Sequence, residues 1–157
     1  MMTKNLIVGL ILGISMSFIS WIVGMIVNYL LSKTEYYQNI SNLNFIKDKT
    51  LNKNIGMRSF KWVVTNTFFK FFNQKIKFEN KKTDLTEMRN EMTLSEISHL
   101  IGFVFVAVAA IYFSFTKSPI VGILMMVPNI LMNLYPSLLQ QENKRRIDKV
   151  ILRQSKL

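Results

Sequence analysis

Glu96 and His99 are the residues of this chain whose types and spacing best suit acid–base chemistry. His99 is the only histidine in the sequence, and Glu96 stands three positions before it. Residues three apart lie on one face of an α-helix. A neutral histidine beside a carboxylate is a good general base, because the carboxylate orients the ring and stabilises the imidazolium. The pair is therefore the candidate catalytic centre. The alternative is that the two side chains only satisfy each other or meet lipid headgroups.

The elements that must position this pair follow from the separation of apolar and charged residues into blocks. Half of the 157 residues are hydrophobic, yet the net charge is +11. The blocks 6–31, 100–116 and 118–141 contain no charged residue. About 20 apolar residues in a helix suffice to cross a bilayer. The sequence therefore predicts an all-α integral membrane protein, a single membrane domain over residues 1–157, with transmembrane helices at about 5–31, 99–115 and 120–139.

Residue types that other chemistry would need are missing. The sequence has no cysteine, which excludes disulfides, thiolate nucleophiles and cysteine metal sites. A single histidine without clustered carboxylates predicts no metal site, and no cofactor is expected. The first apolar block is longer than the ~7–15 residues of a signal-peptide core, and no small-residue cleavage site follows it. We therefore expect it to be a retained helix, residues 1–32 being the first span.

Basic residues gather on one side of the predicted spans. Residues 33–98 contain twelve Lys and Arg, and the tail 142–157 contains six more. Lys4 and Lys117 are the only basic residues on the other side. The positive-inside rule then predicts a multi-pass protein of the bacterial cytoplasmic membrane, with its N-terminus outside and with the loop and the tail in the cytoplasm. This topology accounts for the basic excess, so nucleic-acid binding is not expected.

Two further helical features are predicted in the polar loop 33–98. Between 59 and 73, apolar and aromatic residues share one broad face, which is typical of an amphipathic helix in the membrane interface. Packing of this helix on the spans is the alternative. Asp84, with Glu87 three positions later, resembles a capping box. Nothing breaks a helix between Asp84 and Phe115, so we expect one long helix whose second half is the second span.

The second and third spans form a hairpin over 99–141, because only about three residues join them. Residues that face each other then have numbers that sum to roughly 235. This places Glu96 opposite Leu139 and Gln140, and Asn133 opposite Gly102. Polar side chains in a membrane are expensive and usually face the protein interior. The hairpin therefore predicts a polar cluster of Glu96, His99, Asn133 and Gln140, in which Asn133 or Gln140 donates to a developing oxyanion. Pro128 and Pro136 predict a kink in the third span.

The order of these residues resembles a known family of small bacterial membrane enzymes. Met92, Glu96-x-x-His99 and an apolar span are followed by Asn133-x-x-Pro136 and by Gln141-Glu142-Asn143-Lys144-Arg145-Arg146. The stretch Ile55-Gly56-Met57-Arg58-Ser59-Phe60-Lys61 precedes them. Together, over about residues 54–150, they resemble the glycosyl-4,4'-diaponeurosporenoate acyltransferase family. The chain departs from the family's pattern at Glu142 and Lys144, where the family tends to have arginine.

The resemblance implies a membrane acyltransferase that moves a fatty acyl group onto a hydroxyl of a lipid-like glycoside, such as a carotenoid glycoside. His99, oriented by Glu96, would remove the hydroxyl proton as the oxygen attacks an acyl thioester co-substrate. Substrate-orienting residues would be Asn133, Gln140, Gln141 and Asn143. Basic residues of the tail would meet the phosphates of the acyl carrier, although on their own they favour anchoring to anionic lipid headgroups. These are Lys144, Arg145, Arg146 and Lys149.

A stripe of small residues on the first helix supports a second hypothesis. Gly9, Gly13 and Ser17 are spaced by four. Small residues let two helices approach closely in lipid. The stripe could therefore bind a partner helix or a second copy, and the chain would then be a non-catalytic membrane subunit or scaffold.

Overall fold

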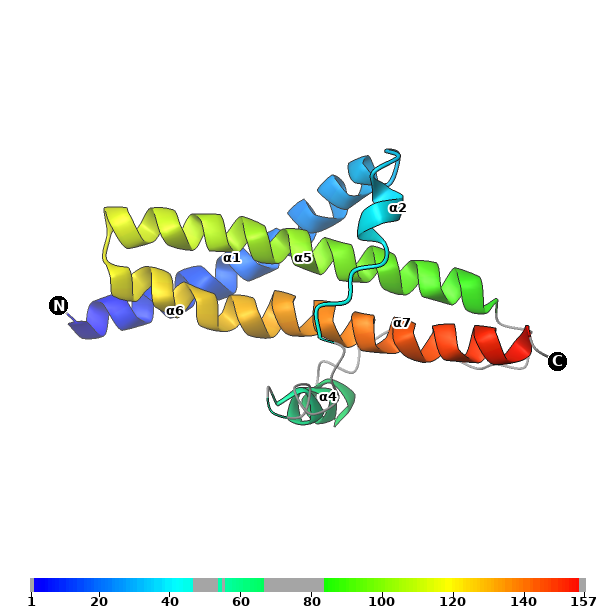
Figure 1. Ribbon diagram of the computed structural model, residues 1–157. Coiled ribbons are helices and arrows are strands. Elements are labelled where there is room, and N and C mark those ends of the chain that lie inside the picture. Colours follow the sequence, from blue (N-terminus) through cyan, green and yellow to red (C-terminus); the bar gives the residue numbers. More distant parts are fainter. Residues whose placement is uncertain (1, 47–53, 55, 67–83, 156–157) are drawn as a thin grey trace.

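Three long helices form the molecule (Figure 1). The computed structural model describes residues 2–46, 54, 56–66 and 84–155. Three of its helical stretches are long and apolar enough to cross a membrane: α1 (Met2–Leu31), α5 (Leu85–Thr116) and the stretch Pro119–Gln154. The described residues contain no strand. The predicted all-α architecture with three spans is therefore confirmed.

The long helix α5 begins and ends where its sequence directs. The Asp84 side chain accepts a hydrogen bond from the backbone N–H of Thr86 at 2.8 Å, and this bond holds the pKa of the Asp84 carboxyl below its ordinary value. The helix then runs without interruption to Thr116, as predicted. A short turn at Lys117 and Ser118 leads into α6, so α5 and the third stretch are antiparallel neighbours (Figure 1).

The third stretch is continuous but irregular in its middle. It consists of α6 (Pro119–Asn129), the π-helix η2 (Ile130–Leu134) and α7 (Tyr135–Gln154). Pro128 lacks the N–H that an α-helix requires, and a local π turn is one way in which a membrane helix accommodates this loss. The irregularity expected from the prolines is thus a π turn just after Pro128. The helix then continues fifteen residues beyond the expected end at 139, to Gln154.

Helix α1 packs on this hairpin through its small residues. Gly9, Gly13 and Ser17 are buried within the chain. A Cβ atom at Gly9 would lie 2.8 Å from Leu124 Cβ, and one at Gly13 would lie 2.5 Å from Pro128 Cγ. The stripe that we expected to bind a partner helix or a second copy is therefore occupied by α6 of the same chain. That expectation needs correction, because close helix approach in lipid is satisfied here within one molecule.

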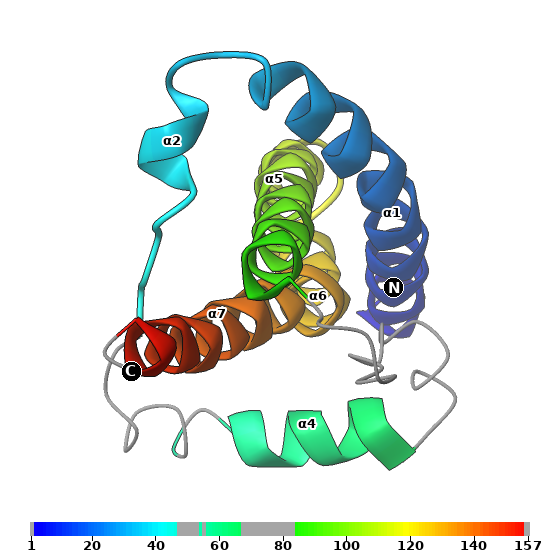
Figure 2. The ribbon, with the colours of Figure 1, turned by 90° about the vertical axis from the view of Figure 1, so that its right-hand side faces the viewer.

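Helix α4 (Met57–Asn66) crosses the bundle. It is seen end-on in Figure 1 and lengthwise in Figure 2, so its axis is roughly perpendicular to α5. Gly56, with a φ of 75°, turns the chain into this helix in a conformation that favours glycine. The helix begins two residues before the predicted 59, and the predicted part from 67 to 73 lies outside the described residues.

Contacts and exposure of α4 combine the two alternatives that the sequence left open. Met57 is buried against Leu138 and Leu139, and the Phe60 ring lies 5.1 Å from the ring of Tyr135. Helix α4 therefore packs on α7. Trp62 is 63% exposed, as an aromatic anchor in a membrane interface would be.

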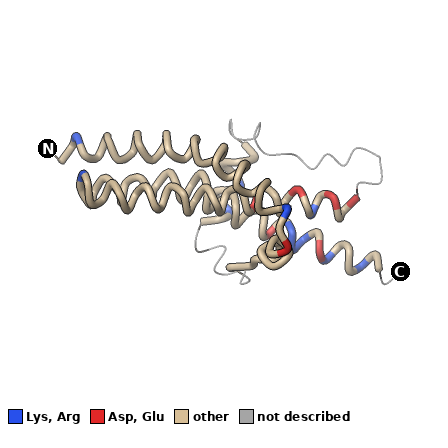
Figure 3. Tube along the Cα trace, turned by 90° about the horizontal axis from the view of Figure 1, so that it is seen from above, with Lys and Arg blue, Asp and Glu red and all other residues tan. Residues whose placement is uncertain are grey.

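Charged residues gather at one end of the bundle, which we call the basic end (Figure 3). It contains residues 33–46, the first half of α5 and the second half of α7. The start of α1 and the turn between α5 and α6, which contain Lys4 and Lys117, lie at the opposite end (Figure 1). Figure 2, which looks along the bundle, shows α5 enclosed at the basic end by α1, by α2 (Tyr37–Ile40) with the segment after it, and by α7.

Candidate functional site

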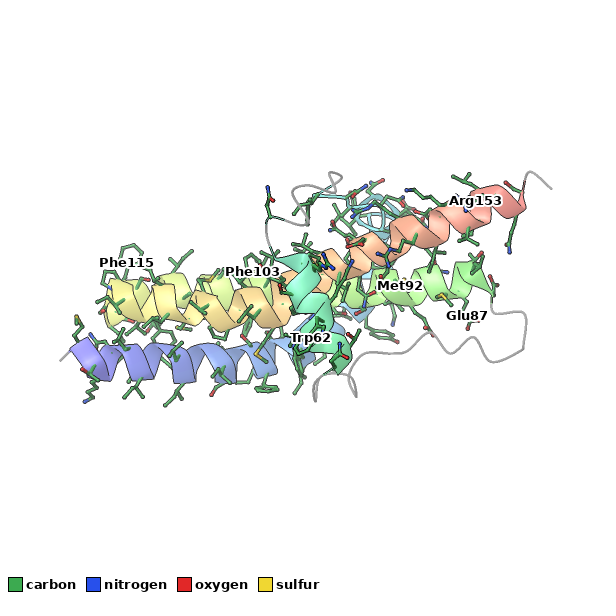
Figure 4. The ribbon with its side chains drawn as sticks, turned by 90° about the horizontal axis from the view of Figure 1, so that it is seen from below. Trp62, Glu87, Met92, Phe103, Phe115 and Arg153 are labelled. Carbon is green, nitrogen blue, oxygen red and sulfur yellow. The ribbon has the colours of Figure 1, made fainter. Side chains whose placement is uncertain are left out.

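A buried polar seam joins α5 to the third stretch. Asn129, Asn133 and Gln141 are at most 1% exposed, and they face the part of α5 that contains the fully buried Glu96. In Figure 4 this part of α5 lies between the labelled Met92 and Phe103. Two members of the predicted cluster, Glu96 and Asn133, thus lie on this seam, which continues deeper into the bundle than expected. Asn129, which was not predicted as a site residue, donates to the Phe103 backbone carbonyl at 3.0 Å.

Glu96 forms an ion pair with Lys144 across this seam. The two side chains are 0% and 4% exposed, and the Lys144 ammonium also donates to the backbone carbonyl of Ser41 at 2.7 Å. The Gln141 amide lies within reach of the same carboxylate. Two sequence-based expectations need correction here. The described contacts of Glu96 are with α7 and not with His99, and Lys144 is enclosed by its partners and is not available to a phosphate.

The segment 41–46 is fastened over the ion pair, and we call it the strap. Its backbone N–H at Phe45 donates to Gln141 Oε1 at 2.9 Å. Arg145 donates to Asn44 Oδ1 at 2.5 Å. Arg89, which also pairs with Asp148 at 2.5 Å, donates to Asn42 Oδ1 at 2.8 Å. The strap has no regular secondary structure, and no periodicity in the sequence indicates it.

The end of α1 completes the enclosure at the basic end. Asn28 is 2% exposed and donates to the Leu94 backbone carbonyl at 2.8 Å and to Ser98 Oγ at 2.9 Å. Tyr37 lies beside Asn28 and Glu96, and burial raises the pKa of its phenol. An amide near the end of an apolar helix carries little sequence signal, and Asn28 was not predicted as a site residue.

His99 occupies the next turn of α5, deeper in the bundle. Its ring packs edge-on against Trp21 of α1, with ring centroids 6.4 Å apart. Its Nδ1 atom is buried without a partner of good hydrogen-bond geometry in the described chain, and the Asn133 side chain lies within reach of the ring. The three spans therefore meet around the single histidine.

Asn133 is held by groups on two helices. Its amide nitrogen donates to Ser20 Oγ at 3.0 Å and to Asn129 Oδ1 at 2.9 Å. A Cβ atom at Gly102 would lie 3.0 Å from Asn133 Oδ1, so the expected approach of Asn133 to Gly102 is confirmed. With both N–H groups engaged, Asn133 Oδ1 is the atom left to accept a hydrogen bond.

The remaining predicted site residues lie along α7. Gln140 Oε1 accepts a hydrogen bond from Asn143 at 3.4 Å. Glu142, where the resemblance expects arginine, forms ion pairs with Lys61 of α4 at 2.5 Å and with Arg146 at 2.7 Å. The carboxylate at 142 thus fixes α4 to α7, while Arg146 stays largely exposed. In the described part of the chain, no three His, Asp or Glu side chains converge to hold a metal ion.

An apolar groove of about 420 Å³ lies on the other side of the contact between α1 and α5. Its walls include Val23 and Val27 of α1, Ile101 and Val104 of α5, and Leu43 of the strap. Its volume is within the range of small-molecule pockets. His99 is on the opposite face of α5, so the groove is separate from the polar seam.

The buried ion pair gives a direct prediction about stability. Lys144→Met should lower the free energy of unfolding by about 3–5 kcal/mol, because it leaves the Glu96 carboxylate buried without a partner. Adding Glu96→Gln to this variant should restore most of the loss. Unfolding of the purified protein in mixed micelles, followed by circular dichroism, measures both effects. Lys149→Met on the exposed face of α7 is the matched control, and equal stability of the two lysine variants would contradict the pairing.

Comparison with known proteins identifies the family. A search of curated proteins and a search of solved structures both return no match. The family model described as glycosyl-4,4'-diaponeurosporenoate acyltransferase matches residues 33–153, which is most of the chain. The match contains α5, α7, the strap and the seam. It begins after α1, which nevertheless contributes Trp21, Ser20 and Asn28 to the site. The chain therefore belongs to the glycosyl-4,4'-diaponeurosporenoate acyltransferase family.

Proposed function

We propose that this membrane acyltransferase moves a fatty acyl group from a thioester onto a hydroxyl of a lipid-like glycoside, with His99 as the general base. The family supports acyl transfer, and its name supports a carotenoid glycoside as the acceptor class. One observation carries the assignment of the base. The single histidine lies in the seam between three spans, with Asn133, itself held in place, within reach of its ring.

The hydrogen bonds of Asn133 support an assignment of the ring nitrogen that acts. Because its N–H groups are engaged with Ser20 and Asn129, Asn133 presents its carbonyl oxygen to the ring. A carbonyl oxygen can only accept, and we assign it to the buried Nδ1, which then carries the proton. Nε2 then keeps its lone pair and is the basic atom. Asn133 thus takes the orienting role that the sequence assigned to Glu96.

The reaction follows from this tautomer. Nε2 removes the proton of the acceptor hydroxyl as the oxygen attacks the thioester carbonyl. The tetrahedral intermediate carries an oxyanion, which needs a hydrogen-bond donor. Gln140 is suited to this role, because its carbonyl oxygen accepts from Asn143 and its N–H groups remain to donate. The C–S bond then breaks, and the imidazolium returns its proton to the leaving thiolate. The products are an ester and a free thiol.

The exposed basic residues of α7 suit the phosphates of the acyl carrier or anionic lipid headgroups. Lys144 is enclosed by Glu96, and Arg145 is engaged with the strap. Arg146 and Lys149 remain exposed at the basic end. Cations there would meet an acyl carrier as it approaches from water.

For this carrier to reach the site, the basic end must face the cytoplasm. The charge asymmetry between the two ends supports this orientation in a bacterial membrane, with the N-terminus outside. Because the chain has no cysteine, single cysteines can report the topology. In intact cells, a membrane-impermeant maleimide should label Lys4→Cys and should label Lys149→Cys only after permeabilisation. Labelling of Lys149→Cys in intact cells would contradict this orientation and show that the basic end faces outside.

Removal of the base tests the proposed activity. His99→Gln should reduce acylated glycoside by at least about a hundredfold, the usual contribution of a general base. Cells that supply a glycosylated carotenoid provide the acceptor, and mass spectrometry of their lipid extract measures the product. Leu94→Gln, at an exposed position of the same helix, is the control and should retain activity. Equal product from wild type and His99→Gln, at equal protein abundance, would refute the role of His99.

A further inference from the structure

Ser137 lies on the polar seam and has no part in the mechanism above. It is four residues after Asn133 and four before Gln141, and all three side chains are at most 1% exposed. Residues four apart in an α-helix are offset by roughly 40° around the axis, because a turn takes 3.6 residues. A π turn takes more residues, so η2 offsets part of this drift. The seam thus continues through Asn133, Ser137 and Gln141 along one side of the helix.

The partners of its two neighbours locate Ser137 relative to α5. Asn133 reaches the His99 ring, and Gln141 reaches the Glu96 carboxylate. Since α5 runs antiparallel to α7, Ser137 falls between His99 and Glu96. Hairpin pairing gives the same result, since numbers that sum to roughly 235 put Ser137 opposite Ser98.

The hydrogen-bonding state of this region is unusual for a buried seam. Ser137 Oγ is buried without a partner in the described chain, as are His99 Nδ1 and Gln141 Nε2. Glu96 Oε1 is in the same state, although Lys144 pairs with the other oxygen. Unpaired buried polar atoms are costly and therefore rare. A hydroxyl both donates and accepts, so Ser137 is chemically able to join the acidic and the basic groups on either side of it.

We propose that Ser137 is a positioning residue that couples Glu96 to His99. These atoms are unpaired in the structure, so the bonds form on a rotation of the side chains: the Ser137 hydroxyl then donates to Glu96 Oε1 and, together with Asn133 Oδ1, accepts from His99 Nδ1–H. Such shared hydrogen bonds are common in proteins. The negative charge of Glu96 then reaches the ring through Ser137, and Nε2 remains the basic atom. The catalytic consequence rests on the proposed function, whereas the hydrogen bond itself does not.

The single histidine makes this hydrogen bond directly measurable. In protein with isotope-labelled histidine, the nuclear magnetic resonance signals of the imidazole nitrogens come from His99 alone. Ser137→Ala should shift the Nδ1 signal, and Ser137→Thr should restore it because the hydroxyl is kept. Ser17→Ala removes an equally buried and equally unpartnered hydroxyl from α1 and should leave the signal unchanged. An Nδ1 signal of Ser137→Ala at the wild-type position would overturn the proposal.

Kinetics separate this proposal from the proposed function. With palmitoyl-coenzyme A and dodecyl glucoside in nanodiscs, Ser137→Ala should lower kcat about tenfold with KM unchanged, the effect of losing one hydrogen bond to the base. Ser137→Thr and Ser17→Ala should retain the wild-type kcat. If Ser137→Ala keeps the wild-type kcat while His99→Gln is inactive, the role of Ser137 is overturned and the proposed function stands. If Ser137→Ala shifts the Nδ1 signal but the wild-type protein makes no ester, the proposed function is overturned and the hydrogen bond stands.

Discussion

The buried ion pair between Glu96 and Lys144 is the interaction on which the basic end of the molecule depends. Two charges at a membrane boundary, nearly without exposure to solvent, are tolerable only as partners. Lys144 also holds the strap through Ser41, so one side chain joins α5, α7 and a segment of no regular structure. Because both helices are fixed there, the polar groups one and two turns deeper keep their register. The ion pair is thus the anchor of the seam.

The two residues that first suggested chemistry lie at different depths of the seam. Glu96 contributes to stability through α7, while His99 lies one turn deeper, where Asn133 and Trp21 surround it. Under the proposed function, the basic nitrogen of His99 meets the acceptor hydroxyl at the lipid boundary. The exposed cations lie on the second half of α7, and the amphipathic helix α4 packs on the first turns of the same helix. A reaction between a lipid-like acceptor and a water-soluble acyl carrier needs both environments to meet at one site.

The three spans were predictable because apolar residues form blocks long enough to cross a bilayer and charged residues lie outside these blocks. The hairpin partners were predictable because the turn at Lys117 and Ser118 is short, so that residues equally far from it face each other. Gly102 against Asn133 is the clearest success of that reasoning. The partner of Glu96 was not predictable, because the expected span ended at 139 and Lys144 was assigned to a solvated tail. Helix α7 continues past the membrane boundary and brings Lys144 back to α5. The strap and Asn28 were missed for a related reason: their contacts depend on tertiary packing and leave no periodic pattern in the sequence.

The central claim is that the His99 ring carries the proton during acyl transfer. Diethyl pyrocarbonate tests this on the unaltered protein, because it acylates imidazole nitrogens and hydroxylamine reverses the modification. The chain has one histidine and no cysteine, so mass spectrometry of the peptide that contains His99 reports the extent of reaction. We expect transferase activity of the purified protein to fall in proportion to the modified fraction of His99 and to return with hydroxylamine. Full activity in protein whose His99 is completely modified would contradict the account.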